Sequence, residues 1–377
     1  GGVTTCYDNG AIATFTTDGT CTSHSTMPRP VYSVCKDHEG RTWMGYFYGG
    51  VACMNADGNI VQSTTEDADQ LVNGIDVDAD GMVWYATFGS GFRSLNPNTG
   101  EVSKFRSDNA AVGLRNNWIN HLQCDNKGRV WLGHCEGLDC YDPAEGQCLK
   151  MKEVDELPFT FCYCICVASD GTVWAGTDNG VVAINTDLHV VGHYTTAEGL
   201  CHDIVSAIVE DSNGNMWVST ARGLSRIAPK GDPKVERYYA GDGLVDRQYI
   251  PRAVACDVTG GRIYFGGTRG ITSFCSMQLD NKRPVPDVRL MALNINTPPA
   301  SARTMSDGNQ VMTVAVTEAD EFRLGYEDNS FTMEFGVTRF ASTDDIAYEY
   351  SFDGNHWETT PQGHNSITFT HLSARKY

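Results

Sequence analysis

Three consecutive aromatic residues, Tyr46, Phe47 and Tyr48, stand just before two glycines, in what reads as a turn. A turn of this length cannot bury three rings in one core, so at least one ring must meet solvent or a partner. Aromatic rings stack on the apolar faces of sugars, while neighbouring amides and charged groups fix the hydroxyls. We therefore predict a ligand contact at this turn, with packing against a neighbouring loop as the alternative.

The same mixture of aromatic, amide and charged residues recurs in three later segments, 111–118, 198–203 and 241–249. Several short turns add single residues of these types. Together they form the predicted saccharide-binding residues, which are Tyr46, Phe47, Tyr48, Phe88, Arg115, Asn116, Asn117, Trp118, His134, His202, Arg222, Arg247, Tyr249 and Arg269. Trp118 is the first residue of a predicted strand. Its side chain could be buried in the core or form an exposed platform for a ligand.

A repeat positions these loops. A turn rich in Asp and Gly precedes a large aromatic residue six times, and these aromatics lie 41 to 47 residues apart, at Trp43, Trp84, Trp131, Trp174, Trp217 and Tyr264. A second turn follows each of them, at Gly50, Gly91, Gly137, Gly180, Gly223 and Gly270. A period in the forties, with four short apolar runs per copy, is typical of a β-propeller blade. The tryptophans share one phase of the repeat, which predicts that they are core residues.

We predict an all-β chain with a seven-bladed β-propeller over residues 1–279. The chain begins at Gly1, inside a repeat, so we expect strands c and d of one blade, five complete blades, and strands a to c of the last. On this interpretation the sequence is a piece of a longer protein, six of its blades largely complete, with the missing strands upstream. Loops from strand d to strand a and turns from b to c emerge on one face, because successive strands alternate in direction. Three loop leucines, Leu114, Leu200 and Leu244, are expected to pack between blades.

Composition limits the partners. Lys and Arg number 28 against 47 Asp and Glu, a net charge of −19, and the acids are spread through turns. A nucleic-acid partner is therefore not expected, because phosphate binding needs a basic surface. Cys162, Cys164 and Cys166 alternate along one predicted strand, so we expect them to share a face as small buried side chains. No ligand spacing typical of zinc or calcium is present, and we predict neither a metal nor a cofactor.

The pattern changes after residue 279. Residues 280–287 contain two prolines and read as a linker. Longer alternating runs follow, at 288–295, 311–317, 321–326, 330–337, 346–352 and 366–370, and they predict an Ig-like antiparallel β-sandwich over 288–377, truncated at its C-terminal end.

These patterns resemble a known family. The repeat Asp-x-x-Gly-x-x-Trp-x-Gly/Ser-Thr-x-x-Gly-Leu, clearest at 170–181 and 211–224, resembles the propeller repeat of two-component regulators. The tail is similar to the triple-tyrosine domain that follows those propellers. Its motifs are matched by Tyr326, Asn329, Phe331, Glu334 and Phe335, by Tyr348, Glu349, Tyr350, Gly354 and Trp357, and by Leu372 and Tyr377, although Ala374 and Arg375 stand where the family has Pro-Gly.

The resemblance implies the periplasmic sensor region of a hybrid two-component histidine kinase. In that family two tandem propellers precede the sandwich, a membrane helix follows, and kinase, receiver and DNA-binding modules lie in the cytoplasm. It implies an oligosaccharide ligand, an upstream propeller as a partner within the chain, a homodimer through the C-terminal sandwich, and no enzyme activity in this segment. Ligand binding would reorient the domains and so signal to the membrane helix.

Two other functions remain open. Asp170 to Trp174 resembles the Asp box of sialidases, and streptogramin lyases share a similar propeller turn. Sialidase chemistry needs clustered arginines at the axis, a role open to Arg222, Arg252 and Arg269. A scaffold propeller without a small ligand is the other alternative.

Overall fold

The computed structural model describes residues 2–6, 11–16, 20–27, 29–64, 70–229, 234–239, 242–257, 261–279, 287–295, 299–337, 346–352, 354–361 and 363–373. The chain divides into two compact units, one of residues 1–239 with 244–279, the other of 240–243 with 280–377. The predicted linker and Tyr377 fall outside the described residues, except for Asp287 at the end of the linker.

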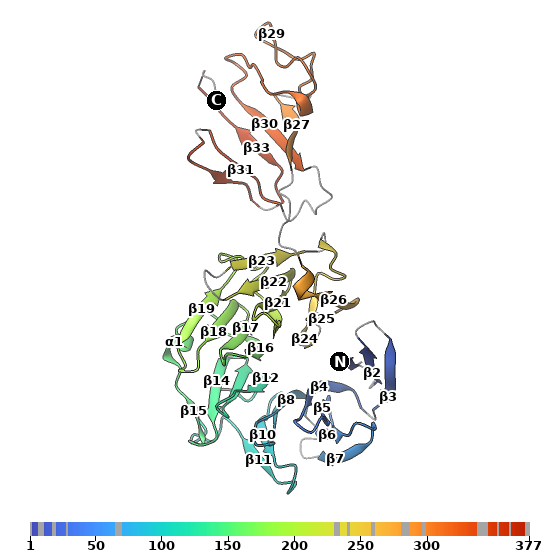
Figure 1. Ribbon diagram of the computed structural model, residues 1–377. Helices are drawn as coiled ribbons and strands as arrows, with labels where there is room; N and C mark the ends of the chain where they lie inside the picture. Colours follow the sequence, from blue (N-terminus) through green and yellow to red (C-terminus); the bar gives the residue numbers. More distant parts are fainter. Residues whose placement is uncertain are drawn as a thin grey trace. The chain divides into compact units, whose positions relative to one another are not determined.

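The described part of the first unit contains seven antiparallel sheets, consistent with propeller blades (Figure 1). The first sheet has strands β1 (Gly2–Cys6), β2 (Ala11–Thr16) and β3 (Cys21–Thr26). The second has β4 (Val31–Lys36), β5 (Thr42–Tyr46), β6 (Val51–Met54) and β7 (Ile60–Thr64), and the third has β8 (Val72–Val77), β9 (Val83–Thr87), β10 (Gly91–Leu95) and β11 (Val102–Phe105).

The remaining sheets follow the same order. The fourth has β12 (Ile119–Cys124), β13 (Val130–His134), β14 (Gly137–Asp142) and β15 (Gln147–Leu149), and a short helix α1 (Lys152–Asp155) leads to the fifth, with β16 (Cys162–Val167), β17 (Val173–Thr177), β18 (Gly180–Ile184) and β19 (Val190–Tyr194). The sixth has β20 (Val205–Glu210), β21 (Met216–Thr220), β22 (Gly223–Ala228) and β23 (Lys234–Tyr238), and the seventh has β24 (Tyr249–Asp257), β25 (Arg262–Gly267) and β26 (Gly270–Cys275), followed by the 3-10 helix η2 (Ser276–Gln278).

The Asp-Gly turn links the first two strands of a blade and also fixes the tryptophan. Between β20 and β21, the Gly214 amide donates to the carbonyl oxygen of Asp211 over 2.9 Å, and Gly214 has φ +79°, which suits glycine. The Asp211 carboxylate accepts the indole N–H of Trp217 over 2.9 Å. Trp43, Trp84 and Trp131 have the same aspartate partner six residues earlier, whereas Trp174 has Ala168 at that place.

The innermost strand of each blade packs beside the innermost strand of the next, through β4, β8, β12, β16, β20 and β24. This packing is close, since a Cβ atom added to Gly74 would lie 2.8 Å from the backbone nitrogen of Leu122 on the next inner strand. In each of the first five of these strands the pairing register shifts at one residue, which is a β-bulge. These bulges place one residue per blade at the same level of the propeller.

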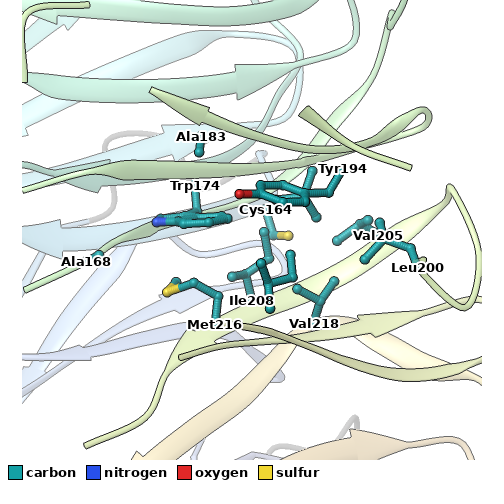
Figure 2. Close-up of a cluster of buried hydrophobic side chains, with 12 residues drawn as sticks. Cys164, Ala168, Trp174, Ala183, Tyr194, Leu200, Val205, Ile208, Met216 and Val218 are labelled. Atoms are coloured by element: carbon teal, nitrogen blue, oxygen red, sulfur yellow. The ribbon is translucent and has the colours of Figure 1, made fainter. Parts of the chain in front are cut away.

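Apolar clusters fill the seams between blades. In the seam between the fifth and sixth sheets, Trp174 and Tyr194 stack with ring centroids 5.7 Å apart, and they face Ile208, Met216 and Val218 (Figure 2). The five predicted core tryptophans are all buried, and Leu114 and Leu200 are buried in such seams too. The predicted core phase of the repeat is confirmed.

Two predictions for this unit are wrong. The first sheet has three strands where two were expected, because residues 2–6 and 11–16 form a hairpin of their own. Cys162 and Cys164 do not share a face, because the bulge at Tyr163 reverses the alternation, and the two thiols lie in different seam clusters. Both are nevertheless buried, and burial raises the pKa of Cys162 to about 12, as for an inert apolar side chain.

The described part of the second unit has a three-stranded sheet of β27 (Val288–Asn294), β30 (Phe331–Val337) and β33 (Ser366–Phe369), in that order. Two short ladders, β28 (Met305–Ser306) with β29 (Asn309–Gln310) and β31 (Glu349–Tyr350) with β32 (Glu358–Thr359), and the 3-10 helix η3 (Val316–Glu318) complete it. No helix among the described residues is long and apolar enough to cross a membrane.

The expected strands at 311–317 and 321–326 are not formed. Val311 and Met312 are buried against Leu293 of the sheet, but a single backbone bond, from Arg323 to Val311 over 2.9 Å, links the two segments. The alternating sequence pattern indicated that one side of each segment is buried. An irregular segment can bury one side as well as a strand can. The described residues therefore show one sheet and two ladders, and the sandwich remains a prediction.

Candidate functional site

The turn between the second and third strands of a blade lies against the residue that precedes its inner strand. The backbone N–H of Phe47 donates to Pro30, that of Phe88 to Leu71, and that of Asp178 to Phe161, over 2.9 to 3.0 Å. Cys135 and Ala221 make the equivalent bonds to Trp118 and Ile204. In these five blades, the second to the sixth sheet, the bonds bring both sets of loops to one edge, which we call the loop face.

Exposed and partly exposed aromatic rings lie along this face on four consecutive sheets. Phe47 lies 6.1 Å from Tyr32 and 4.7 Å from Tyr48 between ring centroids. Phe88 and Trp118 meet edge to face at 4.7 Å, and Phe161 stacks on Tyr163 at 5.9 Å. We call these residues the aromatic arc: Tyr32, Phe47, Tyr48, Phe88, Trp118, Phe161 and Tyr163.

The three aromatic residues of the turn differ in exposure, as the short turn predicts. Tyr46 is 5% exposed and packs in the blade core with Met44, whereas Phe47 and Tyr48 are exposed. Trp118, for which core and platform were both open, is 51% exposed and is a platform. Of the aromatic residues predicted from sequence, Phe47, Tyr48, Phe88 and Trp118 thus belong to the arc.

Two other predicted contacts are buried. His134 ends β13 with no exposed surface, and its Nδ1 accepts the N–H of Glu136 over 3.1 Å, so the ring proton lies on Nε2 in the neutral form. Tyr249 packs edge to face on Phe265, with its hydroxyl 3.3 Å from that of Thr272. Neither side chain offers exposed surface to a ligand, because Tyr249 packs in the cluster between the last two sheets and His134 is fully buried.

Arg115 is held by a buried carboxylate. Its Nε donates to Asp139 over 2.6 Å, and its backbone N–H donates to the other oxygen over 2.9 Å. His134 Nε2 lies 3.1 Å from the same carboxylate. Burial raises the pKa of Asp139, but the proximity of His134 and Arg115 outweighs it, and the pKa lies below its usual value. Arg115 thus presents a fixed, half-exposed guanidinium to the loop face.

The remaining predicted polar residues shape the loops. Asn117 accepts the N–H of Ser107 over 2.8 Å, Asn116 accepts that of Trp118 over 2.7 Å, and His202 accepts that of Ile204 over 2.9 Å. The two asparagine bonds shape the loop that carries Trp118, and the His202 bond shapes the loop before β20. Arg222, Arg247 and Arg269 are exposed on the turns and loops of the last two sheets.

Asp246 locks the loop that carries Arg247 to the turn that carries Arg269. Its carboxylate accepts the Thr268 hydroxyl and the Arg269 N–H, each over 2.8 Å, and the Arg247 N–H over 2.8 Å. The bond from the Thr268 hydroxyl and those from the backbone amides stabilise the ionised carboxylate, and together they outweigh desolvation, which acts in the opposite direction. The pKa of Asp246 is therefore lowered to about 2.

We expect the Asp246 carboxyl carbon to keep its ionised chemical shift as the pH falls from 7 to about 4. Its pKa in the fold lies below the unfolded value, so the lock is at full strength above about pH 4 and is lost as the pH falls towards 2. Carbon-detected NMR of the carboxyl groups, with Asp246→Asn for assignment, measures this. A midpoint near 4 would mean that the lock is not formed.

Sequence reasoning named Arg252 as a candidate for the propeller axis but missed the other residues that lie at the same level. The bulged residues of the inner strands are Tyr32, Asn73, Asn120, Tyr163 and Ser206, and Arg252 stands at the same place in β24. All six stand five residues before the first residue of the hairpin turn, and Trp118 and Phe161 stand seven before it. An alignment of the repeats on that turn, instead of on the tryptophan alone, would identify the positions five and seven residues before the turn.

Comparisons with known proteins agree with this architecture. Residues 113–135, 156–179 and 199–222 match the model of the two-component regulator propeller. Histidine kinase P4 of Formosa agariphila is 23% identical over 288 residues, which are 73% of this chain and 20% of that protein. The chain therefore spans about a fifth of the length of that curated relative.

Solved structures show the same fold. The extracellular domain of a B. thetaiotaomicron protein assigned to the hybrid two-component systems has a TM-score of 0.75 at 24% identity, over 99% of this chain and 50% of that one. A streptogramin B lyase has a TM-score of 0.59 at 16% identity, over 72% of this chain and 89% of that one. The chain thus carries repeats of the two-component regulator propeller family and shares its fold with the extracellular domain of a hybrid two-component system.

Proposed function

We propose that this chain is the ligand-binding part of an extracytoplasmic sensor in a hybrid two-component histidine kinase, and that its loop face binds an oligosaccharide. The observation that carries the proposal is the aromatic arc. Five of its rings are exposed on one face, at Tyr32, Phe47, Tyr48, Trp118 and Phe161. Exposed apolar surface concentrated in this way marks a contact site, and paired flat rings suit the C–H faces of sugars.

The polar groups beside the arc supply hydrogen bonds for hydroxyls. Arg115 is half-exposed and fixed by Asp139, and Asn116 lies beside Trp118 in the same loop. Such pre-positioned donors favour binding because little side-chain entropy is lost when the ligand arrives. Arg222, Arg247 and Arg269 extend the face on the last two sheets.

The carboxylates on this face favour a sensor role over catalysis, because they are already engaged in hydrogen bonds within the protein. Asp139, Asp178, Asp203 and Asp246 all accept hydrogen bonds from backbone N–H groups of the loops and turns around them. Two of the three candidate arginines bond different elements: Arg252 bonds Asn73 and Asn120 on the inner strands, whereas Arg269 bonds Val245 and Asp246 on the loop before β24. A sialidase would need such arginines turned to one substrate carboxylate. The lyase-like fold alone does not favour activity, because a propeller hosts many functions.

Signalling then follows from differential binding. A closed propeller has little internal freedom, so a ligand transmits a signal only if it binds two domain arrangements with different affinity. We propose that the ligand reorients this propeller against an upstream one, and that the second unit, paired as a homodimer, passes the change to a membrane helix of the whole protein.

Thermal-shift measurements against a panel of oligosaccharides released from plant, algal and animal polysaccharides test the ligand class. A binding saccharide raises the free energy of unfolding by about 2.7 kcal/mol at 100 times its dissociation constant. We expect at least one oligosaccharide to raise the melting temperature, with its monosaccharides ineffective. Binding of streptogramins with turnover, and of no saccharide, would support the lyase alternative instead.

A further inference from the structure

Arg252 occupies an unusual position at the propeller axis. Strand β24 loses its pairing register between Tyr249 and Val254, and within this bulge Arg252 has φ +65°. Its Nη1 donates to the backbone carbonyl of Asn73 over 2.7 Å and to that of Asn120, on two other inner strands. Its guanidinium lies over the ring of Tyr32, 5.3 Å from the centroid, on a third.

The positive charge of Arg252 has no full counter-charge in the described part of the chain. Its described hydrogen bonds and ring contact are with Asn73, Asn120 and Tyr32, and none of the ion pairs of the described residues includes it. Burial lowers the pKa of Arg252 below its usual value, and burial, helped by Arg252, lowers the pKa of His121 to about 3. His121 is thus neutral. This uncompensated cation stands in a chain of net charge −19.

Both features are costly without a ligand. A partly buried charge without a carboxylate partner loses hydration that no counter-charge replaces. A non-glycine residue in the left-handed region adds backbone strain. Strain of this kind persists where the surroundings enforce it, which is common at ligand sites.

Arg252 also lies next to the aromatic arc. Tyr32 contacts both Arg252 and Phe47, so the guanidinium and the exposed rings share one side chain. Tyr163, at the same bulge level, belongs to the arc through Phe161. Both Tyr32 and Arg252 keep part of their surface accessible to solvent. A ligand stacked on the arc therefore has its inner end near the axial cation.

We propose that Arg252 binds the anionic group of an acidic oligosaccharide, a carboxylate or a sulfate, whose rings lie on the aromatic arc. This inference rests on the proposed function and names the substrate class of the same face. Planar guanidinium groups pair with either anion through two parallel hydrogen bonds, and the bonds of Arg252 to the carbonyls of Asn73 and Asn120 both use Nη1. Tyr32 would orient the guanidinium by its ring face.

Matched probes test the proposal by calorimetry: trigalacturonic acid with its neutral methyl ester, and a sulfated galactan oligosaccharide with its desulfated form. We expect at least one acidic probe to bind about tenfold or more tightly than its neutral counterpart, with affinity falling as salt rises. The two pairs distinguish a carboxylate from a sulfate.

Arg252→Gly removes the guanidinium and relieves the positive φ, because glycine adopts that conformation readily. We expect it to melt no lower than the wild type and to lose the preference for the acidic probe. Arg262→Gln is the matched control, since it removes one charge from the opposite end of the same blade and should keep the preference. If Arg252→Gly unfolds, Arg252→Lys keeps the charge and loses the paired hydrogen bonds, so its acidic preference should fall.

Each result decides between the two proposals. Neutral probes that bind as tightly as acidic ones, or an acidic preference that survives Arg252→Gly, would overturn the role of Arg252 and leave the saccharide site standing. Failure of every saccharide to bind would remove both.

Discussion

Replacing Trp217 by alanine will destabilise the propeller by about 3–5 kcal/mol, which is a large part of a domain's usual margin. Trp217 has no exposed surface, and it packs on Tyr238 and Phe274 at 5.2 and 4.6 Å between ring centroids. The change leaves a cavity in the seam between the last two sheets and leaves the Asp211 carboxylate without its indole donor. Urea unfolding followed by circular dichroism measures the loss.

Trp217→Phe separates the two contributions. It retains most of the apolar contact and removes the 2.9 Å indole bond to Asp211. We expect it to cost about 1–3 kcal/mol, less than the alanine change. Trp357→Ala, at an exposed position in the second unit, should change the midpoint little. If Trp217→Ala is equally mild, the seam is not where the stability of the ring resides.

Removing two rings of the aromatic arc, by Phe47→Ser together with Trp118→Ala, will weaken oligosaccharide binding by about ten- to a hundredfold. Each ring contributes stacking area from a separate sheet, and both are exposed, so the melting temperature should stay within a few degrees of the wild type. Calorimetry with the saccharide found in the thermal-shift panel measures the effect.

Tyr46 is left unchanged in this variant, although it belongs to the same turn. It is buried with Met27, Val31 and Met44, so Tyr46→Ser would reduce binding only by unfolding the blade. Trp357→Ala again serves as the control, as an exposed aromatic outside the propeller. Full binding by the double variant, with the fold intact, would exclude the arc as the ligand site.

The sequence predicted the propeller because its repeat has a strong physical cause. Each blade needs an Asp-Gly turn and a seam tryptophan, and the bond from Trp217 to Asp211 shows why the two recur together. The bulges were not predictable from alternation, which assumes an unbroken register. The Tyr163 bulge therefore put Cys162 and Cys164 on different faces, and separate bulges in β4 and β24 brought Tyr32 and Arg252 into contact at the axis.

Sequence correctly predicted the exposed site residues only where a short turn has too little room to bury all of its aromatic rings. Three aromatics in one turn forced Phe47 and Tyr48 outward, and both are exposed. Tyr249 and His134 have the same residue types but lie where strands end, and there neighbouring side chains cover them. In the second unit, the alternating pattern at 311–317 correctly indicated buried residues but wrongly predicted a strand. Strand pairing depends on partner segments that the local sequence does not specify.

The seven tryptophan indole N–H signals test the central claim directly. Trp118 is exposed on the loop face, Trp357 is exposed in the second unit, and Trp43, Trp84, Trp131, Trp174 and Trp217 are buried in the blades. In a 15N-tryptophan NMR titration with a binding oligosaccharide, we predict that the Trp118 signal shifts in proportion to occupancy, while those of the five buried indoles stay in place. A saccharide that binds and leaves the Trp118 signal unchanged would contradict a ligand site on the aromatic arc.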